Sequence, residues 1–161
     1  HNMLVGFGIR QHIKVIASGK ILSGFHILRA IALGADGCNS ARAMMMALGC
    51  IQALLCNTNR CPTGITTQDP QLTVGLVVED KKHRVANYHE DTVKSFVELL
   101  GAAGLEDMKQ LTRSHIYRRV FMNEVRTFED VFPSLQPGCL LNGNIPEKYK
   151  QDIEAASADR W

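Results

Sequence analysis

The sequence contains no long hydrophobic run and no marked excess of charge of either sign. Its longest apolar stretch, residues 43–51, is much shorter than the roughly 20 residues that a helix needs to cross a bilayer, so we expect no membrane segment. The 18 Lys and Arg residues and the 16 Asp and Glu residues leave a net charge of +2, which is too small and too evenly mixed to indicate a nucleic-acid partner. Residues 1–4 show neither the charged nor the apolar part of a signal peptide. We therefore expect a cytoplasmic protein.

The chain is also too short for a complete eight-stranded α/β barrel. That fold needs roughly 200 residues or more, whereas this sequence has 161. A composition of 45% hydrophobic, 21% charged and 6% aromatic residues is nevertheless ordinary for a globular domain and excludes wholesale disorder. The length suits one domain of typical size.

The first third of the chain alternates between short β-branched runs and helix-forming segments. The predicted elements are, in order, a strand, a helix, a strand and a helix: residues 13–17, 23–33, 36–39 and from 41 onward. Ser23 is a suitable cap for the first helix, and Gly34 is its expected stop. This order predicts a βαβ unit with parallel strands.

Beyond this unit the pattern becomes mostly helical. A polar loop over residues 57–70 precedes a long helix over residues 80–100, which Gly101 and Gly104 are expected to end. The apolar stripe of this helix consists of Val85, Tyr88, Val93, Phe96, Val97 and Leu100. Past residue 120 we expect only short helices, over residues 127–132 and 146–156, with a turn at 142–144.

Three of the five cysteines form the strongest chemical signal, with the spacing Cys50-x5-Cys56-x4-Cys61 and Pro62 directly afterwards. Cys50 and Cys56 would point to different faces of one continuous helix, so their sulfurs converge only if the helix ends between them, which residues 57–59 favour. Thiolates suit an iron–sulfur cluster or zinc, although zinc would want a fourth ligand. The alternative is that all three are buried free cysteines. The spacing alone leaves both interpretations open.

Small-residue turns follow both predicted strands and form a second signal. They are Ser18-Gly19-Lys20 after the first strand and Asn39-Ser40-Ala41-Arg42 after the second. Backbone N–H groups at a helix N-terminus bind phosphate, and Lys20 and Arg42 add positive charge. These turns therefore predict a phosphate site, although turns of this composition also occur in ordinary strand-to-helix connections.

Four other features are interpreted as structural. The run Met44-Met45-Met46 is typical of core packing, and the basic cluster over residues 115–119 is interpreted as a solvated helix face. Cys38 lies in an apolar strand and Cys139 in a turn, so we expect neither to be a ligand.

The sequence resembles the glutamate synthase family, from His1 to about residue 119. The resemblance depends on residues 13–20, Ala32-Leu33-Gly34-Ala35-Asp36 and the segment from Gly49-Cys50 through Cys61-Pro62-Thr63-Gly64 to Gln68. It implies an FMN-binding (β/α)8 barrel in which Cys50, Cys56 and Cys61 ligate a [3Fe–4S] cluster beside the flavin. It also implies that Ser18, Gly19 and Lys20, together with residues 39–42, hold the FMN phosphate.

The resemblance further implies reductive amination of 2-oxoglutarate to L-glutamate, with ammonia or glutamine as the nitrogen source. The cluster would relay electrons from a reductase subunit or ferredoxin. Two hypotheses remain beside this one: another flavin- or phosphate-binding barrel oxidoreductase with an unknown substrate, and an iron–sulfur electron-transfer module without a substrate. Substrate-binding residues, which this chain does not contain, would decide between the first two, and the third predicts that these 161 residues fold alone and hold iron without flavin.

On this resemblance the chain is expected to be the C-terminal part of a longer barrel. Residues 1–79 would contain about its last two βα units and the cysteine loop, residues 80–120 a helical extension that packs on the barrel, and residues 121–161 an irregular tail with short helices. Two strands cannot close a barrel, so we expect the chain alone to pack loosely and to leave four side chains partly exposed: Ile27, Ile31, Met45 and Leu48.

Overall fold

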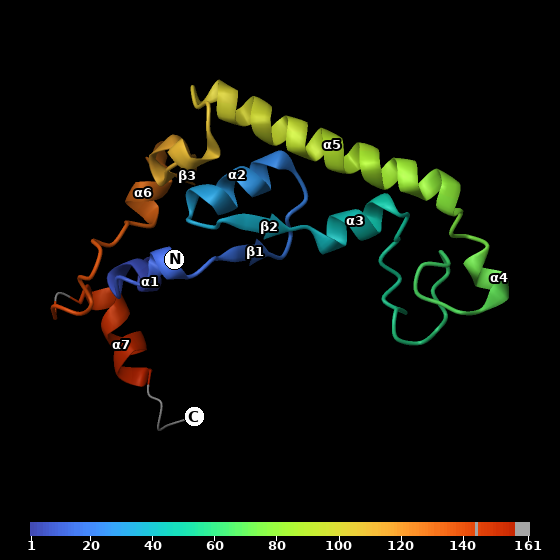
Figure 1. Cartoon of the computed structure of the whole chain (residues 1–161), viewed down its shortest axis with the longest axis horizontal. Coiled ribbons are helices and arrows are strands. Elements are labelled where there is room, and N and C mark those ends of the chain that lie inside the picture. Colours follow the sequence, from blue (N-terminus) through green and yellow to red (C-terminus); the bar gives the residue numbers. More distant parts are fainter. Residues whose placement is uncertain (144, 157–161) are drawn as a thin grey trace.

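A computed structural model describes residues 1–143 and 145–156, and it shows a mixed α/β protein (Figure 1). Its helices and strands are α1 (Asn2–Gly6), η1 (Arg10–His12), β1 (Ile16–Ser18), α2 (Gly24–Ala32), β2 (Gly37–Asn39), α3 (Ala41–Ala47), α4 (Pro70–Thr73), α5 (Val78–Ala102), η2 (Met108–Gln110), η3 (Arg113–His115), β3 (Tyr117–Phe121), β4 (Glu124–Thr127), α6 (Phe128–Val131) and α7 (Glu147–Ala155). Within the two described ranges, no helix is both long and apolar enough to cross a membrane.

The predicted βαβ unit is confirmed. Strands β1 and β2 pair in parallel with Ala17 opposite Cys38, and α2 connects them. Strand β1 begins at residue 16 rather than at the predicted residue 13, because the Val15 N–H donates to the carboxylate of Asp36 at 2.7 Å. Because the strands are parallel, their carboxyl ends meet at one edge of the sheet, and both predicted phosphate turns begin there.

Helix α5 lies across α2 and α3 and covers this unit from above (Figure 1). The main core forms where α2 meets α5 and the segment that follows α5. Its buried side chains are Leu28, Ala32, Leu100, Leu111, Ile116 and Phe128. Gly24 permits the close approach of α2 to α5, since a Cβ there would lie 2.5 Å from the backbone N of Phe96. The four side chains that were expected to be partly exposed are all half-buried.

Helix α5 is longer than the predicted helix over residues 80–100. Gly101 lies inside it rather than ending it, and Gly104, with φ +74°, follows its end. The predicted apolar stripe is used only in part: Leu100 is buried in the core, whereas Val93 and Val97 are 42% and 58% exposed. Leu100 lies in the part of α5 that packs against α2. Residues of the stripe are therefore buried only where α5 contacts α2 and the core, and the stripe as a whole is not buried.

The C-terminal part contains a β-hairpin that the sequence did not suggest. Strands β3 and β4 are antiparallel, with Arg119 opposite Val125, and the basic cluster over residues 115–119 runs into β3. The prediction of a helix face for this cluster is therefore wrong, because backbone pairing with β4 holds the segment extended. The two predicted short helices are confirmed as α6 and α7. In the predicted turn Gly143 has φ +76°, whereas Asn144 lies outside the described residues, as do residues 157–161 of the predicted tail.

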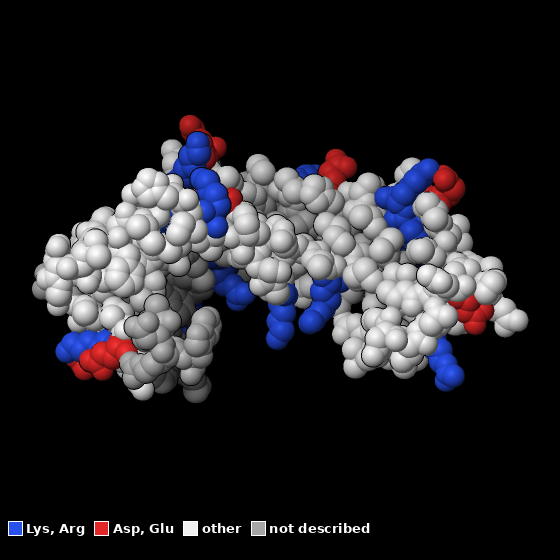
Figure 2. All heavy atoms as spheres, turned by 60° about the horizontal axis from the view of Figure 1, so that its bottom comes forward, with Lys and Arg blue, Asp and Glu red and all other residues white. Residues whose placement is uncertain are grey.

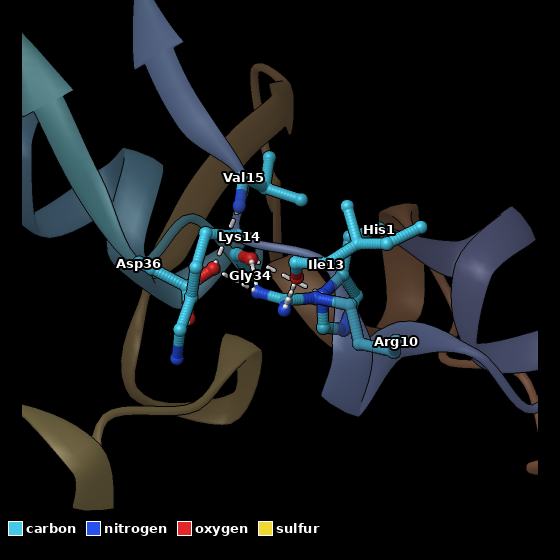
Figure 3. Close-up of polar contacts among 7 residues, drawn as sticks. All are labelled: His1, Arg10, Ile13, Lys14, Val15, Gly34 and Asp36. Carbon is cyan, nitrogen blue, oxygen red and sulfur yellow. Dashed lines mark hydrogen bonds and ion pairs between the residues drawn. The ribbon is translucent and has the colours of Figure 1, made fainter.

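Arg10 fastens the N-terminal segment to the start of β2 (Figure 3). Its guanidinium donates to the carbonyl of Ile13 at 2.6 Å, to that of Gly34 at 2.8 Å and to the carboxylate of Asp36 at 2.7 Å. The Val15 N–H, followed by Arg10 and a more distant Lys14, holds the pKa of Asp36 below its usual value. This cluster lies at the amino ends of the strands, opposite the edge that bears the predicted site.

A buried arginine joins the C-terminal segment to the N-terminal one. Arg113 is only 6% exposed, and it donates to the Asn2 side chain at 2.6 Å, to the Leu33 carbonyl at 3.4 Å and to the Phe132 carbonyl. The Asn2 amide in turn donates to the Tyr149 hydroxyl at 2.8 Å, so α1 and α7 lie side by side (Figure 1). The segment after α5 is therefore anchored to the βαβ unit by polar contacts as well as by the core.

Candidate functional site

The two predicted phosphate turns are adjacent at the carboxyl edge of β1 and β2. The Ser40 hydroxyl donates to the Ile21 carbonyl at 2.6 Å and so ties one turn to the other. Gly19, with φ +90°, and Lys20, with φ +55°, turn the chain sharply after β1. A Cβ at Gly19 would meet nothing within 4 Å, so its backbone borders open space.

That open space belongs to a cleft of about 580 Å³, which is within the usual range for a small-molecule site. Six of the seven predicted phosphate-binding residues line it, namely Ser18, Gly19, Lys20, Asn39, Ala41 and Arg42. Ser40 is placed at its edge by the bond to Ile21 instead. Among the described lining residues, the charged ones are Lys20 and Arg42. Figure 2 shows Lys and Arg side chains projecting into a hollow on this side of the molecule.

Two of the three predicted cluster ligands line the same cleft. Cys50 and Cys56 do so, whereas Cys61 is buried and does not line it. Cys56 also lines a second cavity of about 410 Å³, to which Thr66 belongs. Two of the three thiols therefore border the cleft, and Cys56 is common to both cavities. In the described part of the chain, no three His, Cys, Asp or Glu side chains converge closely enough to hold a metal ion.

The helix break needed to bring the thiols together lies earlier than predicted. Helix α3 ends at Ala47, before Cys50, rather than between Cys50 and Cys56. Gly49 has φ +105°, and the backbone N–H of Cys50 donates to the Met45 carbonyl at 3.0 Å, which is a Schellman ending. Both cysteines are therefore in the loop and do not depend on helix geometry for their direction.

The environment of Cys61 differs from that of the other thiols. The Thr63 hydroxyl lies 3.3 Å from its sulfur. Hydrogen bonding by Thr63 and then by Thr66 lowers the pKa of Cys61 to about 6, so this thiol is largely ionised at neutral pH. Burial in β2 has the opposite effect on Cys38 and raises the pKa of that thiol. The thiolate is the form that binds metals, so the opposite pKa shifts distinguish the environments of these two thiols.

Backbone strain collects in the same region. The non-glycine residues with positive φ in the described chain are Lys20, Gln52, Leu54 and Asn59. The first three line the cleft, and Asn59 lines the adjoining cavity. Asn59 also closes the loop, because its side-chain oxygen accepts from the Gln68 N–H at 2.7 Å. Strained residues of this kind cluster at ligand sites.

Sequence reasoning did not identify Gln52, Leu54, Thr63 or Thr66 as parts of the site. The backbone N–H of Gln52 lies 3.4 Å from the Cys50 sulfur, and Leu54 is 84% exposed at the cleft. Thr63 lies two residues after a predicted ligand, and its hydroxyl is 3.3 Å from the Cys61 sulfur. Nothing in the local pattern marked the left-handed conformations of Gln52 and Leu54.

The cleft fits a flavin mononucleotide phosphate, and the loop fits an iron–sulfur cluster by donor chemistry. The Gly19 backbone borders space that a side chain would fill, next to two cationic residues. Cys50, Cys56 and Cys61 supply three thiol donors in one loop, of which Cys50 and Cys56 line the cleft and Cys61 does not.

A family model described as "Conserved region in glutamate synthase" matches residues 1–106, which include every residue of the candidate site. The glutamate synthase large subunit-like protein YerD of Bacillus subtilis strain 168 is 44% identical over 117 residues, which are 73% of this chain and 22% of that protein. The archaeal glutamate synthase (NADPH) of Methanocaldococcus jannaschii is 42% identical over 104 residues, 65% of this chain and 20% of that protein. The glutamate synthase (NADH) of Saccharomyces cerevisiae is 26% identical over 156 residues, 94% of this chain and 7% of that protein. The chain spans about a fifth of the length of the first two relatives.

Proposed function

Because this chain belongs to the glutamate synthase family, we propose that it forms the phosphate end of the FMN site and the iron–sulfur loop of a glutamate synthase. The parent activity is reductive amination of 2-oxoglutarate to L-glutamate, with nitrogen from ammonia or glutamine. In this proposal β1, α2, β2 and α3 are the last two βα units of a (β/α)8 barrel. The parallel pairing of β1 with β2 and the position of the cleft at their carboxyl edge support it.

One observation carries the proposal: a single cleft collects both phosphate turns and two of the three cysteines. Phosphate turns alone would suit many α/β proteins, and a cysteine loop alone would suit a small electron-transfer module. Their meeting in one cleft favours a flavin phosphate held close to the cysteine loop.

Each residue of the cleft has a distinct task in this proposal. The backbone N–H groups of Gly19 and Ala41, which line the cleft, would hold the phosphate, and Lys20 and Arg42 would balance its negative charge. The Ser40 hydroxyl keeps the two turns at a fixed separation through its bond to Ile21. These groups would bind and orient the phosphate end of the cofactor.

Cys50, Cys56 and Cys61 would each supply one thiolate to a [3Fe–4S] cluster. When bound, the flavin supplies hydride transfer to the substrate, and the cluster supplies single electrons to the flavin. We propose a reductase subunit or ferredoxin as the electron donor. The names of two relatives specify NADPH and NADH for those proteins.

An anaerobic absorption spectrum of the longest natural form of the protein, combined with iron and sulfide analysis, tests this function. We expect flavin bands superposed on broad sulfur-to-iron absorption. Single Ser substitutions of Cys50, Cys56 and Cys61 should each lose iron, whereas the matched controls Cys38→Ser and Cys139→Ser should retain it. A colourless wild-type protein, or loss of iron from Cys38→Ser with retention in Cys56→Ser, would refute the proposal.

A further inference from the structure

The outer edge of strand β3 has no partner strand. Within the described residues the C-terminal sheet consists of β3 and β4 alone, and it lies at the end of the molecule opposite the cysteine loop (Figure 1). In an antiparallel pair, every second residue points its backbone N–H and C=O groups away from the partner strand. A β-bulge between Arg119 and Phe121 twists the far end of β3, so the regular part of this open edge is residues 117–119. All three of these residues are exposed.

Arg118 is the charged centre of this edge. The register sets Arg118 opposite Arg126, and like charges directly opposite each other on two strands are destabilising. Arg126 forms an ion pair with Glu124, whereas Arg118 makes no ion pair within the described residues. The neighbouring Arg119 donates to the Met122 carbonyl and so holds the turn of the hairpin. The charge of Arg118 therefore remains unbalanced within the described chain.

The other face of the hairpin carries exposed apolar side chains. Side chains alternate between the two faces of a strand, so Tyr117 and Val125 share the face to which Arg118 does not point. They are 67% and 52% exposed, and they lie diagonally across the two strands. At the end of the hairpin, Phe121 and Met122 are 68% and 88% exposed. Aromatic residues, methionine and arginine are the residue types enriched in protein–protein interfaces.

The charge pattern disfavours a second copy of β3 as the occupant of this edge. Antiparallel pairing of residues 117–119 with a copy of themselves would set Arg118 opposite its own counterpart. Pairing of all five residues of β3 would do the same for Arg119. Charged side chains on an edge strand are one way in which natural sheets avoid joining to their own copies. An acidic strand meets attraction at the same positions.

We propose that the outer edge of β3 binds an extended segment of a partner protein in which acidic and apolar residues alternate. The segment adds to the sheet as a third strand, and its backbone pairs with the free N–H and C=O groups of β3. Its acidic side chains lie beside Arg118, and its apolar side chains lie beside Tyr117 on the other face. A nucleic acid would use the arginine and the aromatic ring but leave the backbone groups of the edge unpaired, so the edge favours a polypeptide. The interaction is independent of the cleft and of any cofactor.

Fluorescence anisotropy with a short labelled peptide that alternates glutamate and valine tests this proposal in the longest natural form of the protein. We expect saturable binding, and we expect the amides of residues 117–121 to exchange more slowly with solvent when the peptide is bound. The same peptide with all its backbone amides methylated should not bind, because it has no N–H groups to donate to the edge of the sheet.

Charge reversal separates pairing at Arg118 from general attraction to a basic protein. Arg118→Glu should weaken binding of the glutamate–valine peptide by roughly tenfold, because an attractive cross-strand pair becomes a repulsive one. It should bind a matching lysine–valine peptide instead. Arg84→Glu is the matched control, since it changes the net charge equally at an exposed residue near the start of α5, whereas the hairpin follows the end of α5. Binding should be unchanged in this variant.

Tyr117→Ser tests the apolar face, and it should weaken binding of the glutamate–valine peptide without creating affinity for the lysine–valine peptide. Failure of the glutamate–valine peptide to bind, or equal weakening by Arg118→Glu and Arg84→Glu, overturns the proposal. It is also overturned if the β3 amides are already protected from exchange without peptide, since the edge is then covered by the protein itself or by a second copy. Protection of β3 by a single-stranded RNA oligonucleotide but not by the peptide would assign the surface to nucleic acid instead.

Discussion

Replacement of glycine by alanine is expected to have opposite effects on stability at Gly24 and at Gly101. Gly24 lies in the first turn of α2 and faces α5, where a Cβ would lie 2.5 Å from the Phe96 backbone N and 2.8 Å from the Ser95 carbonyl carbon. These are backbone atoms that cannot rotate away, so Gly24→Ala requires α2 and α5 to separate by about 1 Å to restore van der Waals contact. At Gly101, inside α5, a Cβ would meet nothing within 4 Å.

The expected magnitudes follow from overpacking and helix propensity. Overpacking costs about 1–3 kcal/mol, and replacement of a helical glycine by alanine returns about 0.5–1 kcal/mol. Gly24→Ala should therefore destabilise the contact between α2 and α5 by about 1–2 kcal/mol. Gly101→Ala has only the favourable part and should stabilise the end of α5 by about 0.5–1 kcal/mol.

Peptide-resolved hydrogen exchange on the longest natural form of the protein measures both effects. Amides around Leu28 and Ala32 in α2 should exchange roughly five- to thirtyfold faster in Gly24→Ala, because 1.4 kcal/mol corresponds to about tenfold. Exchange at the end of α5 should slow in Gly101→Ala. Unchanged or slower exchange of α2 in Gly24→Ala would show that the two helices do not pack as closely as described, and the core assignment would fail with it.

The remaining predictions concern the cleft and the two polar clusters. Gly19→Val should reduce FMN retention at least tenfold, because a φ of +90° disfavours a side chain and because that side chain would fill the phosphate space. The control Gly104→Val, at a glycine with φ +74° away from the cleft, should retain FMN. Equal retention in both variants would refute this placement. Asp36 has a lowered pKa, so its contribution to stability is present above the ordinary carboxyl pKa and is lost as the pH falls through the lowered one; thermal unfolding from neutral to acidic pH should show this loss in the wild type and a flatter profile in Asp36→Asn. Arg113→Met leaves several buried acceptors without a donor and should cost about 2–4 kcal/mol, detected as faster proteolysis beyond residue 112; unchanged proteolysis would contradict the proposed anchoring.

The βαβ unit was predictable because its signals are local. Ser23 and Gly34 bracket α2, and the structure places them at its N-cap and immediately after its C-cap, where Gly34 has φ +105°. Even here the chemistry differs in detail, since the Ser23 hydroxyl lies 2.9 Å from His26 Nδ1 and does not cap a backbone N–H. Turns at the carboxyl ends of parallel strands must be neighbours, so most of the cleft followed from the strand prediction.

The hairpin and the exact position of the cysteines were not predictable in the same way. Tyr117 and Phe121 of β3 are 67% and 68% exposed, so the strand lacks the alternation that burial would impose on its sequence. Its conformation comes from pairing with β4, which is a contact that no single segment encodes. Cys61, which does not line the cleft, lies in a loop that a hydrogen bond between Asn59 and Gln68 closes across nine positions, which is likewise a contact that no single segment encodes. The end of α3 at Gly49 was visible in the sequence, but the requirement that the thiols converge placed the break too late.

The left-handed residues around the cleft have a consequence for how fast and how tightly any ligand is captured. Gln52 and Leu54 each disfavour their left-handed conformation by about 1–2 kcal/mol relative to a relaxed chain, whereas Asn59 tolerates it. We therefore expect the loop without a ligand to exchange between this arrangement and looser ones, of which only the first is competent to bind. The apparent dissociation constant exceeds the intrinsic one by the inverse of the competent fraction. Ligand binding and ordering of the loop are thus coupled in one equilibrium. The rate of proteolytic cleavage near Leu54 measures the fraction of loop that is not ordered, and it should fall when a ligand binds.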